Sequence, residues 1–546
     1  MNNWKKVSLS AAVVAAGLIL SACSTNSSSK AIQFSLTSDI STLDPTMAQD
    51  QYSDEIIGNV QEGLTRTDAS GNPALALAKS INVSKDGLTY TIDLKPNLKW
   101  SNGDALTAQD FVYSWQRAVN PATGSEYAYL ITGAVKNAQA IYSMKAPTQA
   151  DLNTLGVKAD SKTKLTVTLA QATPYFKMLL AEPVYYPLDE KVVNADGKAF
   201  GTNSAKMVYD GPYMFKSTNA WTGSSKTFSI YKNPNYYDAS AVKSKEVDFQ
   251  VVSNTNTGVS LFKSGKLDFS LLTTPDAIQA NTKAKGYTTY KQARTDYIEY
   301  NQTGSVPALK NQDIREALNL ATNRKAVVST ALPGSSVATS FSPAGFAKTN
   351  TGEDFASYVK QDYSYNPTKA KELWAEGLKQ LGVKSVNLNF EYASDMAPAV
   401  STSQELQTAW QDALPGLTVS LKGVPFTQLI NDQSNQNFQV VLGGWGGDYA
   451  EPSTFLQLFT TGASYNDGKF SSTAYDKAYT AATTTDALND SKRFADYKTC
   501  EDILSQNSYI NPIDFQTTSA LVNPNLKGME FHSTGLAYDL KTAYVQ

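Results

Sequence analysis

Apolar and polar residues alternate in two segments of the first third of the chain, residues 88–94 and 164–169. Such alternation is typical of strands that bury one face. Between the two segments, Thr107 and Asp110 have the spacing of a capping box, and apolar residues then recur at helical intervals, at positions 111, 115 and 119. The pattern predicts two strands and, between them, a helix that begins after Thr107.

The second half of the chain alternates between helical and strand patterns. Asn366 is a typical helix cap, and the proline after it suits the first helical position. Residues 386–392 then alternate strictly, 406–413 have helical spacing, and 417–421 alternate again. An apolar run at 438–442 leads into glycines. Helices that alternate with strands predict an α/β lobe.

Composition limits the classes of function. The chain has 546 residues, with 47 Lys and Arg against 50 Asp and Glu, so its net charge of −3 offers no basic excess for nucleic acid. A chain of this length has room for about two to four units, each with its own core. It contains 30 Tyr but a single histidine, His532, an imbalance that favours recognition over catalysis.

The N-terminus carries a targeting pattern. Lys5 and Lys6 precede an apolar stretch, 7–20, that is too short to span a membrane but suits the core of a signal peptide. The stretch ends in Leu20-Ser21-Ala22-Cys23, which resembles the lipobox of bacterial lipoproteins. We therefore expect a signal peptide at 1–22 and, at 23–35, a lipidated Cys23 with a flexible tether; an ordinary signal peptide is the alternative. The protein would lie at the extracellular face of the cell membrane.

Motifs of common catalytic sites are missing from the sequence. No Gly-Lys pair is followed by Ser or Thr, which excludes a P-loop, and there is no Gly-x-Ser-x-Gly segment. His532 is expected to be a surface or packing residue, and Cys500, within helical apolar spacing, a buried structural thiol. We expect no catalytic residue, no cofactor and no metal site. Paired carboxylates are set in space rather than along the chain, which leaves a surface hydrolase as a remote alternative.

A long run of residues and four shorter pieces form a recognisable set. The run covers 77–80, 86–103 and 106–117, with Lys99-Trp100-Ser101-Asn102-Gly103 at the end of its middle part, and the shorter pieces are 42–45, 62–64, 210–213 and 444–455. In content and order this set resembles the oligopeptide-binding lipoproteins of peptide ABC importers, which are family 5 extracellular solute-binding proteins. The resemblance covers nearly the whole chain after the signal peptide.

The resemblance implies an α/β fold of the two-lobed periplasmic-binding-protein type, also called the Venus flytrap fold. Crossing strands would join the lobes, which close over the ligand, and an extra subdomain would sit on the first lobe. The boundaries that the resemblance implies are 36–64, 200–290 and 518–546 for lobe I, 65–199 for the extra subdomain, and 291–517 for lobe II.

The resemblance also implies a ligand site in the segment 444–455. In this family the free amine of an extended peptide is held by an aspartate, and the motif places that role on Asp448; a loop-capping Asp is the alternative. Gly444, Gly446 and Gly447 would let the peptide backbone approach closely, or else form a tight turn. Trp445 would line a side-chain pocket, where a lone aromatic would otherwise belong to the core.

Further residues follow from the same resemblance. Tyr127 matches a tyrosine whose hydroxyl touches the peptide backbone, and Gln49 and Gln51 align with a segment that lines the cleft; ordinary surface or packing roles are the alternative. Relatives that prefer short peptides place basic side chains where this chain has Leu442 and Gln433. We therefore expect that the protein does not hold the C-terminal carboxylate of its peptide tightly and accepts longer or more apolar peptides.

The expected function is that of a non-enzymatic, lipid-anchored receptor that captures oligopeptides and delivers them to the permease subunits of an ABC importer. The expected partners are the peptide, the permease and the membrane, with no nucleic acid, and the protein is expected to be a monomer. A receptor for one signalling peptide, or a carrier of another small ligand such as haem, is the alternative.

Overall fold

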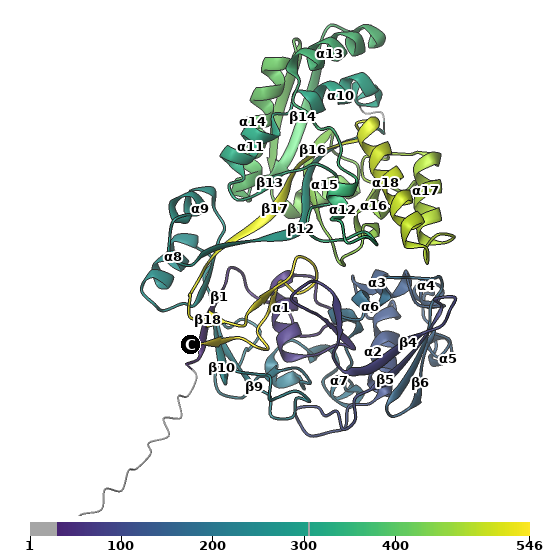
Figure 1. Cartoon of the computed structure of the whole chain (residues 1–546), viewed down its shortest axis with the longest axis vertical. Coiled ribbons are helices and arrows are strands. Elements are labelled where there is room, and N and C mark those ends of the chain that lie inside the picture. The colour runs from purple at the N-terminus through teal and green to yellow at the C-terminus, as the bar shows by residue number, and fades with distance from the viewer. Residues whose placement is uncertain (1–29, 304–305) are drawn as a thin grey trace, which may run out of the picture.

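The computed structural model describes residues 30–303 and 306–546, which form two lobes that share one 11-stranded sheet (Figure 1). We call the part around β1 and β8–β11 lobe I and the part around β14–β16 lobe II. The order across the sheet is β15 (Leu417–Val424), β14 (Val386–Ala393), β16 (Val440–Gly446), β12 (Tyr287–Tyr300), β17 (Ile510–Val522), β11 (Phe269–Leu272), β1 (Ile32–Leu36), β10 (Glu246–Val251), β9 (Thr227–Lys232) and β8 (Tyr213–Met214), with β13 (Ser336–Val337) also paired to β17.

Two long antiparallel strands, β12 and β17, run from one lobe into the other (Figure 1). At the lobe I end Tyr287 pairs with Leu521, and at the lobe II end Glu299 pairs with Ile510. The register shifts twice between these ends, once at 291–295 and once at 296–297. Because a bulge bends and twists a strand pair, these shifts mark where the connection between the lobes can flex. They confirm the expected crossing strands.

Lobe II carries helices on both faces of its part of the sheet. Neighbouring residues of β12 show this, since Ile298 packs into one core cluster and Tyr297 into another. The first cluster lies under α10 (Gln312–Leu320), α11 (Arg324–Ala331), α13 (Pro367–Leu381) and α14 (Ala397–Ala413). The second lies under α16 (Ser453–Leu456), α17 (Thr473–Thr483) and α18 (Asp490–Gln506). The helix and strand patterns predicted for this half are confirmed, including the Asn366 cap, which accepts a hydrogen bond from the backbone of Lys369.

A separate four-stranded antiparallel sheet forms the extra subdomain beside lobe I. Its order is β4 (Ala78–Val83), β5 (Thr89–Leu94), β7 (Lys164–Thr168) and β6 (Val157–Ser161), and α2 (Ala108–Val119) covers it. The predicted capping box is present, because the backbone N–H of Thr107 donates to Asp110 Oδ2 at 2.6 Å. Trp100 and Trp115 are buried in its core.

The start of the described chain corrects one expectation. β1 lies between β10 and β11 and pairs in parallel with both, and Ile32, Phe34 and Leu36 are buried in the core of lobe I. Residues 32–35 therefore belong to the fold, and the tether expected at 23–35 reaches too far. The apolar residues at alternate positions need a buried face, which a tether cannot provide. The predicted signal peptide and Cys23 lie outside the described residues.

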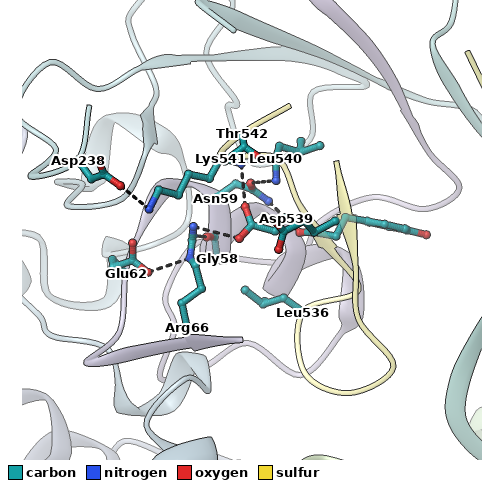
Figure 2. A network of polar contacts seen from close by, with 12 residues as sticks. Gly58, Asn59, Glu62, Arg66, Asp238, Leu536, Asp539, Leu540, Lys541 and Thr542 are labelled. Atoms are coloured by element: carbon teal, nitrogen blue, oxygen red, sulfur yellow. Dashed lines mark hydrogen bonds and ion pairs between the residues drawn. The ribbon is translucent and has the colours of Figure 1, made fainter. Parts of the chain in front are cut away.

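The C-terminal segment is fastened into lobe I by a polar network (Figure 2). Arg66 lies at its centre, with Nε 3.0 Å from Glu62 Oε1, Nη1 3.1 Å from Asp539 Oδ2 and a hydrogen bond from Nη2 to the carbonyl of Gly58. Lys541 pairs with Asp238 at 2.8 Å. Buried charges are costly unless paired, so this network holds the chain end in one place. The residues after β17 thus return to lobe I.

Candidate ligand-binding site

β16 has one edge that is paired with a neighbouring strand over only part of its length. On one side it pairs with β12 along its whole length, from Val440 opposite Tyr300 to Gly446 opposite Arg294. On the other side β14 pairs with it only at Val440 and Val441. On the side of β14, residues 442–446 therefore present backbone groups that pair with no strand of the described chain. An extended ligand could add to this edge as a further strand.

The predicted glycines lie along this edge. Gly444 and Gly446 are within β16, whereas Gly447 follows it, so the first two form part of a strand rather than of a turn. A Cβ added to Gly444 would lie 2.2 Å from Asp296 Oδ1 and 2.3 Å from Arg294 Nη2. Glycine leaves room for that pair, whose Nε–Oδ1 distance is 2.9 Å, and a larger residue would have to displace the two side-chain ends. The guanidinium of Arg294 consequently lies over the strand.

Asp448 stands just beyond the end of β16 and is half-buried. Thr454 holds it twice: its hydroxyl donates to Asp448 Oδ2 and accepts from the Asp448 backbone N–H, both at 3.1 Å. Burial raises the pKa of Asp448 to about 6, and hydrogen bonds from Tyr129 and Thr454 oppose the rise. A carboxylate with this environment gains from a cationic partner, because its charged form is poorly solvated.

Aromatic side chains surround the carboxylate. The rings of Tyr127 and Tyr129, from the extra subdomain, lie 5.7 Å apart, and burial together with Asp448 raises the pKa of both hydroxyls. On the lobe II side, the Trp445 ring lies 5.0 Å from Tyr465. The indole N–H of Trp445 is buried and has no hydrogen-bond partner among the described residues. It is therefore available to an acceptor on a ligand.

Two more carboxyl groups face the same space from lobe I and the extra subdomain. The pKa of Glu182 is raised well above its usual range by burial and by the neighbouring Asp448 and Asp54. The pKa of Asp54, on α1 (Gln51–Val60), is raised to about 7 by burial and by Asp50. The site as a whole therefore favours a positively charged group over an anion.

The other predicted residues differ in their placement. Gln49 and Gln51 are exposed next to and at the start of α1, and no contact joins either to Asp448. Leu442 is buried in the core of lobe II. Gln433 is buried beside Gly443, and its Nε2 lies 3.3 Å from the position that a Cβ on Gly443 would occupy. Neither position offers a cation to a ligand. The cation that does reach β16, Arg294, comes from the neighbouring strand.

Sequence reasoning missed several residues of the site. Arg294 and Asp296 belong to β12, which pairs with β16 although about 150 residues separate them along the chain. Glu182 and Tyr465 carry no local signal of their own. Tyr129 could have been found, because it is only two residues from Tyr127 and shares its short helical turn.

The two lobes touch next to this site. The ring of Tyr449, the residue after Asp448, stacks on Tyr175 of the extra subdomain, with centroids 4.4 Å apart and planes inclined by 6°. A cavity of about 140 Å³ lies beside this pair, between the subdomain and lobe II, with Tyr129, Gln457 and Tyr479 in its wall. The structure therefore has the lobes in contact across the site.

Residues 72–467 match the sequence model of a protein family described as bacterial extracellular solute-binding proteins, family 5 Middle. The chain belongs to this family. The resemblance noted from the sequence is thereby confirmed, and the family consists of solute-binding proteins. Its members act outside the cell membrane, as their family description states.

Known members resemble the chain over nearly its full length. The dipeptide-binding protein of Lactococcus lactis subsp. cremoris is 65% identical over an alignment of 555 positions that covers 100% of both chains. The structure titled Listeria monocytogenes OppA bound to peptide is 34% identical, with a TM-score of 0.79 and coverage of 95% of this chain and 100% of that one. The pheromone receptor PrgZ has 32% identity, a TM-score of 0.79 and the same coverage. These neighbours confirm the predicted two-lobed α/β fold.

No helix in 30–303 or 306–546 is long and apolar enough to cross a membrane. In the same ranges no three His, Cys, Asp or Glu side chains are grouped so that they could hold a metal ion. Cys500 and His532 are both buried, and Nδ1 of His532 lies 3.0 Å from the carbonyl oxygen of Leu536. The site thus consists of strand edge, carboxylates and aromatic rings.

Proposed function

We propose that this protein captures peptides outside the cell and delivers them to the permease of an ABC importer. The observation that carries the proposal is the free edge of β16, which ends at the half-buried carboxylate of Asp448. A strand edge binds the repeating backbone of any peptide, and a carboxylate at its end binds the free amine. Together they select a peptide by its main chain and its N-terminus.

The peptide would lie with its ammonium group at Asp448 and its backbone along residues 442–446. This direction is antiparallel to β16, since Asp448 follows the strand. From Asp448 back to Leu442 the chain can span at most about 21 Å, which corresponds to a peptide of about six residues. Tyr127, Tyr129 and Trp445 would contact its backbone and first side chains. Gln49 and Gln51 would take part only through later residues of a longer ligand.

The C-terminal carboxylate would be held weakly. Leu442 and Gln433 provide no cation, and the guanidinium of Arg294 is already paired with Asp296. Asp514, which pairs with Asp296 across the strands, is fully buried, and its pKa is raised well above the usual range by burial and by Asp296. An arginine with such neighbours attracts a further carboxylate less than a free one would. Longer peptides could therefore extend past this point.

Closure of the lobes would trap the peptide. β12 and β17 would absorb the motion at their register shifts, as hinges do. Tyr449 stacks across the interface directly after the ligand-binding Asp448, so a peptide bound at Asp448 would hold Tyr449 in place. The domain limits implied by the resemblance, with 291–517 as lobe II, agree with such a motion.

The location and the partners are part of the same proposal. Cys23 would carry a lipid after removal of 1–22, so that the mature protein is anchored at the outer face of the cell membrane. The protein would act as a monomer and catalyse no reaction. A second candidate function, reception of one signalling peptide, is supported by the likeness to the pheromone receptor PrgZ; it predicts capture of a single peptide instead of many.

Native mass spectrometry of residues 24–546 with a mixed peptide pool would test the proposal. We expect the parent to capture many peptides, Asp448→Ala to capture them weakly, and the matched control Asp412→Ala, an exposed aspartate on α14, to behave as the parent. Capture of one species would favour the signalling receptor. Unchanged capture by Asp448→Ala would show that the amine is held elsewhere.

A further inference from the structure

Lobe I contains a second cavity, remote from Asp448. It has a volume of about 680 Å³ and lies between α8 (Thr255–Lys263), α9 (Pro275–Asn281) and the end of β17. Phe262, Leu267 and Leu521 form apolar walls, and Lys263, Lys283 and Lys285 lie around it. An apolar pocket with a basic rim suits an amphiphile with an anionic head.

The rim of this cavity carries positively charged side chains. Lys263, Lys283 and Lys285 are exposed, and none of them forms a salt bridge with a described residue. The carboxylate of Asp268, the residue after Leu267 in the cavity wall, is buried and accepts from the backbone N–H of Gln33 and the side chain of Asn523, at 2.9 and 2.6 Å. Positive charge therefore gathers here on a chain whose formal net charge is −3.

One polar atom of the pocket lacks a partner. Asn281 lines the cavity, is only 4% exposed, and donates through Nδ2 to the carbonyl of Ala277. Its Oδ1 is buried without a hydrogen-bond partner in the described part of the chain. Such an acceptor is costly unless a donor reaches it, and a hydroxyl group on a ligand would do so.

The cavity lies where the N-terminal segment leaves the fold. Gln33 and Asp268 exchange two hydrogen bonds, and Leu267, the neighbour of Asp268, is part of the wall. Six residues lie between Cys23 and residue 30, so an anchor on Cys23 would keep residue 30 within about 25 Å of the lipid surface. α8 and α9 also lie on the side of the molecule opposite α3 (Ala128–Thr132) and α17 (Figure 1).

We infer that this pocket binds the headgroup of an anionic phospholipid that carries a hydroxyl, such as phosphatidylglycerol. The lysines contact the phosphate, Asn281 accepts from the headgroup hydroxyl, and the apolar walls cover the glycerol and the first methylene groups. The inference goes beyond peptide capture and rests on the proposed anchor for its geometry. It places the lipid contact on lobe I alone, so lobe II stays free to move during closure.

Vesicle flotation of residues 24–546, which include the whole described fold, tests this inference. We expect binding to vesicles that contain phosphatidylglycerol and none to pure phosphatidylcholine. A basic residue at an anionic surface contributes about fivefold in affinity, so the triple variant Lys263→Gln, Lys283→Gln, Lys285→Gln should bind about a hundredfold more weakly. The control Lys369→Gln, Lys371→Gln, Lys379→Gln removes equal charge from α13 and should change binding less than about twofold.

A second variant separates the pocket from diffuse charge. Ala280→Trp fills the cavity without changing any lysine, and it should abolish binding of a soluble short-chain phosphatidylglycerol measured by calorimetry. Equal binding to phosphatidylcholine, an unchanged triple variant, or an unchanged Ala280→Trp would overturn the inference. Displacement of the short-chain lipid by inorganic phosphate alone would overturn the assignment to a lipid. Peptide affinity should stay constant in every variant, so failure here leaves the proposed function untouched.

Discussion

Acidification should weaken peptide binding through Asp448. Its pKa is about 6 in the ligand-free protein, because burial penalises the charged form, and the ordinary value is 3.8. Only the ionised carboxylate attracts the ammonium group of a peptide. With a pKa of 6, about a tenth of the molecules are ionised at pH 5 and about a hundredth at pH 4. The apparent Kd should therefore rise about tenfold and then a hundredfold above its plateau, whereas an ordinary aspartate would leave it nearly constant at pH 5.

The sign of the proton exchange gives a second readout. Below pH 6 the free site holds a proton that the ammonium group displaces, so binding should release about one proton there. Near pH 7 binding should release almost none, because Asp448 is mostly ionised and the α-amine of the peptide is still protonated. Titration calorimetry between about pH 8 and pH 4.5, in two buffers with different heats of ionisation, measures both quantities. Asp54 and Glu182 titrate nearby, and the Asp448→Asn variant isolates their contribution.

The matched control is Asp412→Asn, which should keep the full pH dependence. A Kd that stays constant from pH 8 to pH 4.5 in the parent would refute the reasoning. So would an equal slope in Asp448→Asn, since the titrating group would then lie elsewhere.

Three further outcomes follow from the structure. Gly211→Ala should lower the free energy of unfolding by about 1–3 kcal/mol in urea titrations, because its Cβ would lie 2.5 Å from the backbone nitrogen of Gln61. Gly444→Ala should cost less than about 1 kcal/mol, because its Cβ would meet only the ends of the Arg294 and Asp296 side chains, which can move aside; equal effects would contradict the packing argument. Cys500 should resist alkylation in the folded protein and react fully in denaturant, because the thiol is buried and burial raises its pKa. Rapid labelling of the native protein would be inconsistent with that placement. The ligand-free protein should become more stable to urea as the pH falls from about 8 to 5. Burial raises the pKa of Glu299 to about 8 and that of Asp54 to about 7, so both bind protons in the folded state that the unfolded state has lost. Stability that rises with pH over this range would contradict this expectation.

Local patterns predicted much of lobe II and of the extra subdomain. The capping box before α2 and the Asn366 cap of α13 act within a few residues, so they are visible in the sequence. β1 was readable as well, from its alternating Ile32, Phe34 and Leu36, but the serine-rich residues before it favoured a tether.

The site was only partly readable, for a physical reason. Glycine has no side chain and so adds nothing to a hydrophobic pattern, which hid the continuation of β16 through Gly443 and Gly444. Arg294 and Asp296 reach the site through pairing of strands that are far apart in sequence. Such pairing depends on the whole sheet, and no local pattern encodes it. The sequence motif indicated Asp448 as a candidate ligand-binding residue, whereas most of its neighbours could be identified only in the structure.

The position of β17 in the chain has a consequence for how the molecule is made. Residues 510–522 form a central strand that pairs with β11 of lobe I, with β13 and with β12, yet they are among the last to be synthesised. Neither lobe has a complete sheet before they arrive, so most long-range contacts form late. In a nascent chain the sheet shared by the two lobes would therefore stay incomplete until almost all of the chain has been made, whereas the extra subdomain has its own sheet. Once complete, the two lobes should melt in one cooperative transition, because each depends on the same strand.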